Sequence, residues 1–301
     1  MRAPPAPGRT DEERRTRQKA AAWTGESDLQ NISIGLVPRI AAVNSLGVGG
    51  TNACAVVAEA PRRDPAASSF GHVLLPALRR TAQRVRPLGP PAAGDQVYGI
   101  CPAGRGPRVS EPSLTRLPDL VTALLDETDF EPPFVFFGHS LGALTAFETA
   151  RALRARGRPL PRRLIVSAHA APGTQRRRDA WHTLPDEELI RALNDSYDSI
   201  PEHVLADPHL MAMSLQAIRA DFQLLDGHRH RAEDPLPVPI DAFYGEADTV
   251  PLPAVEQWRH HTARAFRTHP FPGGHFHFRH VDIFDVLGTL LHSTAAEDRS
   301  P

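Results

Sequence analysis

The stretch that most constrains this chain is residues 134–142, where the apolar run Phe-Val-Phe-Phe leads directly into Gly-His-Ser-Leu-Gly. Residues 143–148 have helical character, so the order is that of a buried strand, a tight turn and a helix. Gly138 and Gly142 carry no Cβ, so the backbone can double back and leave Ser140 at the tip in a strained conformation. Its hydroxyl would then stand clear of the sheet, beside the first N–H groups of the helix. The alternative is a chance pair of glycines in a turn.

Ser140 needs partners, because a serine hydroxyl is a weak nucleophile at neutral pH without a general base and a group that orients that base. In chains with this elbow, a carboxylate and then a histidine follow the serine. Residues 238–245 and 266–271 are typical of strands, and Asp248 and His275 lie just past their ends. Open parallel sheets place their sites at the carboxyl ends of the strands. We therefore expect Ser140, Asp248 and His275 to converge as the catalytic residues.

Two rivals to Asp248 and many other histidines have to be weighed. Asp241 lies inside its predicted strand and Glu246 stands one step too early in the loop, so Asp248 is favoured. The chain has 15 histidines, but only His275 follows two glycines after a strand, which frees its loop to move. The remaining candidates are expected at the surface or in packing: His139, His228, His230, His260, His261, His277 and His280.

Candidate strands and helices alternate from about residue 70 onward. The expected strands are 70–75, 97–101, 134–137, 164–168, 238–245 and 266–271, and the expected helices are 114–126 and 141–156. This alternation predicts an α/β fold, a mostly parallel sheet with helices on both faces. Residues 181–230 break the rhythm with helical segments alone, and we expect them to form a lid over the site.

Composition excludes several classes of function. The chain has 34 basic and 35 acidic residues and a net charge of −1, which argues against nucleic acid as a partner. No window approaches the ~20 apolar residues needed to cross a bilayer, and no secretory signal is expected. With two cysteines far apart in the sequence, no disulfide framework is indicated. We expect a cytoplasmic monomer without a bound metal or cofactor.

The N-terminal residues have a different character from the rest. Residues 1–35 are polar and are expected to be disordered. Residues 44–53, Asn-Ser-Leu-Gly-Val-Gly-Gly-Thr-Asn-Ala, resemble the C-terminal end of a polyketide-type β-ketoacyl synthase domain, although Cys54 stands where that family usually has histidine. The synthase's active-site residues are absent, so a condensing activity is excluded. We expect three parts: a disordered segment 1–35, a synthase remnant and linker 36–63, and the catalytic domain 64–301.

Residues from about 70 to 278 resemble a type II thioesterase of polyketide and nonribosomal peptide assembly lines, within the α/β-hydrolase superfamily. The runs that carry the resemblance are Phe137–Leu144, Gly104–Gly106 before Glu111-Pro112, Ser167–Pro172, Leu205–Pro208, Ile218–Phe222 and Pro272–Phe276. The resemblance implies hydrolysis of acyl groups from the phosphopantetheine thiol of acyl or peptidyl carrier proteins, which clears stalled or mis-primed units. The alternatives are another serine hydrolase, either a small-molecule esterase or an acyltransferase, and a degenerate binding module.

The oxyanion hole is where the chain departs from the family. The Leu141 N–H is one expected donor, because this residue follows the nucleophile. In the family a Pro-x-Ala-Gly-Gly turn supplies the second donor, and an ungapped alignment makes Ala77 the candidate. That alignment places Leu78-Arg79-Arg80 on the Ala-Gly-Gly positions, and arginines would be strained where φ is positive. One lost oxyanion donor costs about 10²–10³ in rate, so we expect replacement of both arginines by glycine to raise turnover.

The lid carries apolar residues at helical spacing. Its expected helices are 185–193, 201–205 and 210–225. Two interpretations remain open: each residue packs in a core, or together they roof an acyl chamber. The residues concerned are Leu210, Met211, Met213, Leu215, Ile218, Phe222 and Leu225.

Overall fold

The computed structural model describes the backbone of residues 54–59, 85–87 and 95–100, and backbone with nearly all side chains at further positions up to residue 290. Those positions are 102–105, 108, 110–130, 132, 134–174, 180–197, 202–279, 283, 286–287 and 289–290. The expected disordered segment 1–35 and the expected strand 70–75 lie outside the described residues.

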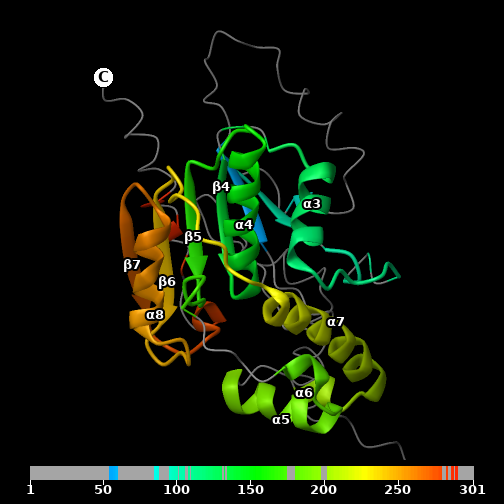
Figure 1. The fold of residues 1–301 in the computed structure, drawn as a ribbon. Helices are drawn as coiled ribbons and strands as arrows, with labels where there is room; N and C mark the ends of the chain where they lie inside the picture. The colour runs from blue at the N-terminus through cyan, green and yellow to red at the C-terminus, as the bar shows by residue number, and fades with distance from the viewer. Residues whose placement is uncertain are drawn as a thin grey trace, which may run out of the picture. The chain divides into compact units, whose positions relative to one another are not determined.

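The described strands form one seven-stranded sheet with the order β2-β3-β1-β4-β5-β6-β7 (Figure 1). The strands are β1 (Cys54–Glu59), β2 (Val85–Pro87), β3 (Asp95–Ile100), β4 (Phe134–His139), β5 (Arg163–Ser167), β6 (Ile240–Gly245) and β7 (Phe266–Phe271). Strands β4 to β7 pair in parallel, and β1 is antiparallel to both β3 and β4. Strand β3 therefore runs in the same direction as β4 to β7. The predicted α/β fold is confirmed.

Strand β1 belongs to the stretch 36–63 that the sequence assigned to a synthase remnant. It pairs with both neighbours, with Val57 opposite Val97 of β3 and opposite Val135 of β4. Because β1 pairs along both of its edges, it fills the space between β3 and β4 in the sheet. Its apolar sequence, Cys-Ala-Val-Val-Ala, is typical of a strand inside a sheet. The sheet thus includes part of this stretch, whereas the resemblance of residues 44–53 to a synthase stays a prediction.

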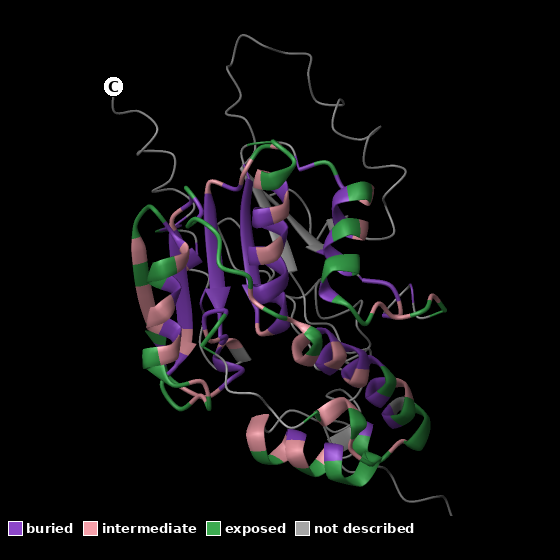
Figure 2. Cartoon of the chain, in the orientation of Figure 1, coloured by how far each residue is buried: buried purple, intermediate pink, exposed green. Residues whose placement is uncertain are grey.

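Helices and the C-terminal segment cover the two faces of the sheet. Helices α3 (Leu117–Glu127), α4 (Leu141–Ala155) and α8 (Leu252–Glu256) pack on the face that carries Phe134 and Phe136. Residues of the segment 283–290 pack against the opposite face, where Val135 and Phe137 point. Strand β4 is therefore buried along its whole length, as Figure 2 shows. This explains why its sequence is a continuous apolar run rather than an alternating one.

The expected lid is present between β5 and β6. It contains a short 3₁₀ turn (Trp181–Thr183) and helices α5 (Asp186–Tyr197), α6 (Glu202–Leu205) and α7 (Pro208–Gly227). In Figure 1 these helices lie at the bottom of the view, on the side toward which the arrow of β5 points. None of the helices among the described residues is long and apolar enough to span a bilayer.

Candidate active site

The turn after β4 holds Ser140 in the strained conformation that the sequence predicts. Ser140 has φ 53° and ψ −122°, a left-handed φ that is rare for a residue other than glycine. Its N–H donates to the Ser167 carbonyl at 2.8 Å, and its carbonyl accepts from the Ala143 N–H at 3.0 Å. A Cβ on Gly138 would overlap the Gly142 carbonyl and lie 2.6 Å from the Ala143 nitrogen. Glycine at position 138 is therefore required for the turn to close.

The loops after β6 and β7 lie at the same edge of the sheet and pack closely where glycines leave room for the backbone. A Cβ on Gly245, the last residue of β6, would lie 2.6 Å from the Gly273 carbonyl oxygen. The Ala247 N–H donates to that carbonyl at 2.9 Å, and Gly273 itself has φ +103°. These contacts fix the loop after β6 against the loop after β7. Because β4, β6 and β7 point the same way, all three loops lie at their carboxyl ends.

The loops bring Asp248 and His275 together. His275 Nδ1 lies 3.2 Å from each carboxylate oxygen of Asp248, and the two side chains are 5% and 0% exposed. Since Nδ1 faces the carboxylate, Nε2 is the nitrogen that remains for a substrate or for Ser140. Ser140 is half-buried at the end of β4, on the same edge.

The rival carboxylates are placed differently. Asp241 is buried inside β6, where it forms an ion pair with Arg163 and contacts His269 Nε2 at 2.7 Å. Burial by itself raises the pKa of Asp241, but the hydrogen bond from His269 and the charge of Arg163 lower it below its ordinary value. Glu246 is exposed. Neither of them shares the contact with His275 that Asp248 makes.

Two histidines expected at the surface or in packing are buried behind the site. His139 and His277 are fully buried, and both contact the Ser167 hydroxyl, at 3.0 Å from His139 Nδ1 and 3.4 Å from His277 Nε2. Burial lowers the pKa of His277 to about 4, although the nearby Asp248 charge raises it. His277 is thus neutral at neutral pH. In the sequence, His139 precedes Ser140 and His277 follows His275 by two residues, but nothing in it predicts that both histidines contact the Ser167 hydroxyl.

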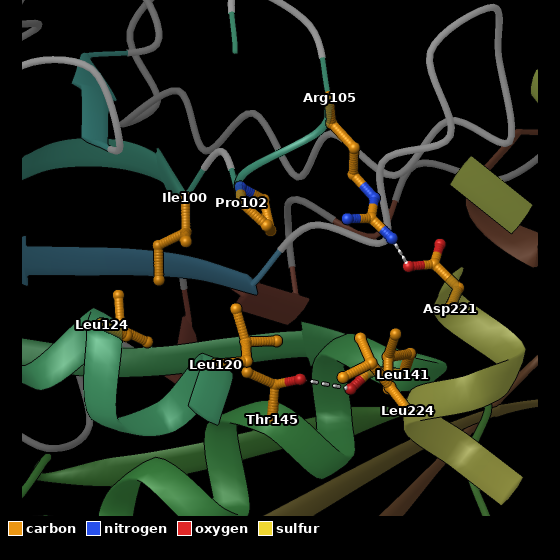
Figure 3. A pocket seen from close by; sticks show the side chains of 9 residues that line it. All are labelled: Ile100, Pro102, Arg105, Leu120, Leu124, Leu141, Thr145, Asp221 and Leu224. Carbon is orange, nitrogen blue, oxygen red and sulfur yellow. Dashed lines mark hydrogen bonds and ion pairs between the residues drawn. The ribbon is translucent and has the colours of Figure 1, made fainter. Parts of the chain in front are cut away.

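A cavity lies beside the residue that follows Ser140 (Figure 3). Leu141 lines it from the first turn of α4, directly after Ser140 in the chain, and the Thr145 hydroxyl donates to the Leu141 carbonyl at 2.9 Å. The other lining residues are Ile100, Pro102, Arg105, Leu120, Leu124, Asp221 and Leu224. The second expected oxyanion donor, Ala77, lies outside the described residues, as do Arg79 and Arg80.

A buried ion pair joins the lid to the rest of the site. Arg105, in the loop after β3, pairs with Asp221 of α7 and donates to the Ala217 carbonyl at 3.2 Å. The two side chains are 2% and 6% exposed. They belong to the two runs around residues 104–106 and 218–222 that carry the family resemblance.

The apolar residues of the lid pack mainly on one another. They form their own cluster, made of Leu189, Leu193, Val204, Met211, Leu215, Ile218 and Phe222. Of the two interpretations, these contacts favour packing within the lid for most of the residues concerned. Among the α7 side chains that the structure describes, only Asp221 and Leu224 contribute to the cavity described above.

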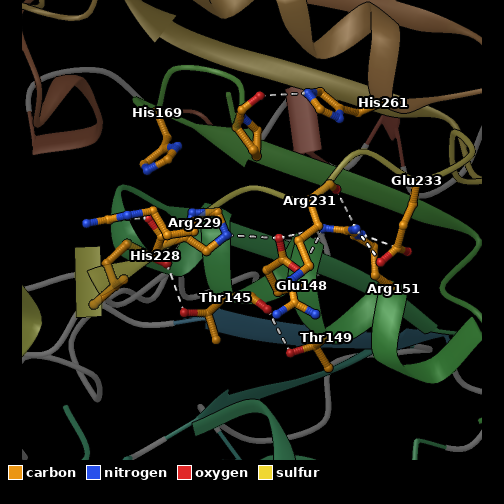
Figure 4. A network of polar contacts seen from close by, with 12 residues as sticks. Thr145, Glu148, Thr149, Arg151, His169, His228, Arg229, Arg231, Glu233 and His261 are labelled. Atoms are coloured by element: carbon orange, nitrogen blue, oxygen red, sulfur yellow. Dashed lines mark hydrogen bonds and ion pairs between the residues drawn. The ribbon is translucent and has the colours of Figure 1, made fainter. Parts of the chain in front are cut away.

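The segment after α7 is fastened to α4 by charged groups (Figure 4). Arg151 of α4 contacts Glu148 at 2.9 Å and Glu233 at 2.5 Å, and it donates to the Arg231 carbonyl at 2.8 Å. His228 Nε2 lies 3.1 Å from Glu148. Burial raises the pKa of Glu148, but the His228 and Arg151 contacts outweigh it and lower the pKa. The lid is therefore held at its C-terminal end as well as by Arg105.

The chain is similar to known thioesterases in both sequence and fold. The family pattern described as "Thioesterase domain" matches residues 91–292. The gramicidin S biosynthesis protein GrsT of Aneurinibacillus migulanus is 37% identical over 184 residues, 60% of this chain and 72% of that protein. The RedJ thioesterase of the prodiginine pathway in Streptomyces coelicolor is 31% identical with a TM-score of 0.57, covering 65% and 78% of the two chains. BorB, a type II thioesterase of the borrelidin cluster, is 32% identical with a TM-score of 0.57, covering 65% and 80%.

Proposed function

The chain belongs to the thioesterase domain family, and we propose that it hydrolyses acyl groups from the phosphopantetheine thiol of carrier proteins in a polyketide or nonribosomal peptide assembly line. Relatives named for gramicidin S, prodiginine and borrelidin biosynthesis support this setting. The observation that carries the chemistry is the contact of His275 with Asp248 at the sheet edge that also holds the strained Ser140. The role is the removal of stalled or mis-primed units.

The proposed first step is transfer of the acyl group to Ser140. His275 Nε2 takes the hydroxyl proton as Ser140 Oγ attacks the thioester carbonyl, and the Asp248 carboxylate stabilises the imidazolium that forms. The Leu141 N–H donates to the oxyanion, since it stands at the start of α4 beside the nucleophile. Collapse of the intermediate breaks the carbon–sulfur bond. The phosphopantetheine sulfur takes the proton from His275 and leaves as the thiol.

In the second step, water replaces the thiol. His275 takes a proton from water, which attacks the acyl-serine carbonyl, and the proton is then returned to Ser140 Oγ as the free acid leaves. These steps need no bound metal or cofactor, because the phosphopantetheine arrives on the substrate. Ala77 remains the proposed second oxyanion donor.

The test is hydrolysis of an acetyl- or propionyl-loaded carrier protein, followed by the mass of the intact carrier. We expect the wild-type protein to release the acyl group and Ser140→Ala to leave the carrier loaded, because the nucleophile is lost. Preference for a p-nitrophenyl ester over the loaded carrier would instead identify a small-molecule esterase. If neither substrate reacts, the protein is a degenerate homologue and the proposal fails.

A further inference from the structure

An aromatic residue of the lid lies against the proposed general base. Tyr197 is the last residue of α5, and its ring centroid is 4.6 Å from that of His275, with the ring planes tilted by 42°. Tyr197 and His275 are far apart along the chain, so no sequence pattern connects them. This contact joins the lid directly to the proposed catalytic residues.

The other groups that pack on the His275 ring come from the sheet side. His139 lies 4.9 Å away and Phe276 lies 5.0 Å away, centroid to centroid, both with steeply inclined planes. Asp248 contacts Nδ1 at 3.2 Å through each oxygen. This distance is at the long end of the range for an N–H···O hydrogen bond. The carboxylate contacts the imidazole at Nδ1 only, so the rings packed around it also contribute to its tilt.

The lid holds Tyr197 in place through its own core. Leu189 and Leu193 of α5 are fully buried in the lid cluster. Tyr197 packs against the edge of that cluster, and its ring centroid is 6.1 Å from that of Trp181. The ion pair of Arg105 with Asp221 ties the same assembly to the loop after β3. The position of the Tyr197 ring therefore depends on a docked lid.

We propose that Tyr197 is a positioning residue of the thioesterase, whose ring holds the His275 imidazole in the orientation needed for proton transfer at Ser140. This inference rests on the proposed function. With this role for Tyr197, the lid positions a catalytic residue as well as covering the substrate. The proposed role needs the aromatic ring of Tyr197 and not its hydroxyl, so phenylalanine at this position should perform it as well.

The test compares Tyr197→Ala and Tyr197→Phe on two substrates, a loaded carrier protein and the acetyl thioester of N-acetylcysteamine, which needs no carrier docking. We expect Tyr197→Ala to lower kcat by about 10²-fold on both substrates with little change in KM, the scale of a misplaced catalytic group. Tyr197→Phe should keep a kcat close to that of the wild type. Ile190→Ala is the matched control, because it removes apolar volume from the same helix at a half-buried position in the lid cluster.

Three results would overturn the inference: an unchanged kcat in Tyr197→Ala, a loss confined to the carrier substrate, or a Phe variant as slow as the Ala variant. If Ile190→Ala loses as much as Tyr197→Ala, the effect is general lid damage and the inference also fails. Should Tyr197→Ala unfold, Tyr197→Leu keeps the apolar volume without the ring and is expected to fall between Phe and Ala. Inactivity of the wild type on both substrates would instead contradict the proposed function.

Discussion

At the scale of single residues, two aspartates of one strand–loop unit each contact a histidine in very different surroundings. Asp241 is locked inside the sheet between Arg163 and His269. Asp248 has its buried carboxylate aimed at His275 in the loop. The first arrangement neutralises a buried cation, whereas in the proposed mechanism the second orients His275 as a base at the edge where Ser140 lies. Substitution of each carboxylate by an amide separates the two roles.

We expect Asp248→Asn to lower kcat by about 10⁴-fold with a nearly unchanged midpoint of thermal unfolding, since the amide favours the wrong tautomer of the histidine. Asp241→Asn should lower the free energy of unfolding by about 3–5 kcal/mol, because Arg163 is left buried without its counter-charge. The folded fraction of that variant should retain its activity. Steady-state hydrolysis and urea unfolding measure the two effects, and loss of kcat in folded Asp241→Asn would contradict the assignment.

At the scale of elements, the local parts of the site could be predicted from the sequence. The strand, elbow and helix around Ser140 are contiguous, and the strand 266–271 begins and ends at the predicted residues. The contact of Tyr197 with His275 and the pair of Arg105 with Asp221 could not be predicted, because periodicity reports on one element and not on its partner. The sequence also does not predict that the strand Cys54–Glu59 belongs to this sheet, because its neighbours β3 and β4 are set by tertiary pairing.

The pair of Arg105 with Asp221 is an element-scale connection that can be tested directly. Asp221→Leu alone should cost about 3–5 kcal/mol in unfolding free energy, because a buried guanidinium loses its partner. The double variant Arg105→Met with Asp221→Leu should recover most of that loss. A double-mutant cycle from urea unfolding measures the coupling. Additive losses would mean that the two side chains do not depend on one another.

At the scale of the whole molecule, the pKa shifts predict that stability in acid depends on two histidines, the buried His277 and the half-buried His261. Burial lowers the pKa of His277 to about 4, behind the active site, and burial also lowers the pKa of His261 to about 4, beside the Pro172 carbonyl. In the unfolded chain both would bind a proton near pH 6.5. Between these values the unfolded state binds more protons than the folded state, so stability falls as pH falls.

We therefore expect the free energy of unfolding to decline from about pH 6.5 to pH 4, by on the order of 3 kcal/mol for each of the two histidines across the window. Glu148 and Asp241, whose pKa values are lowered, lose their contributions only below the ordinary values of 4.5 and 3.8. His277→Gln and His261→Gln should each flatten the decline. Urea unfolding at a series of pH values measures the slope, and an unchanged slope in both variants would exclude these residues as its source.

The strained backbone at Ser140 has a consequence for how the chain changes over generations. A left-handed conformation costs of order 1–3 kcal/mol at a residue with a side chain, and glycine would relieve most of it. Selection for stability alone would thus favour glycine at position 140. A lineage in which hydrolysis no longer mattered would be expected to replace this serine and to gain stability. A serine at this strained position is therefore what the proposed function predicts.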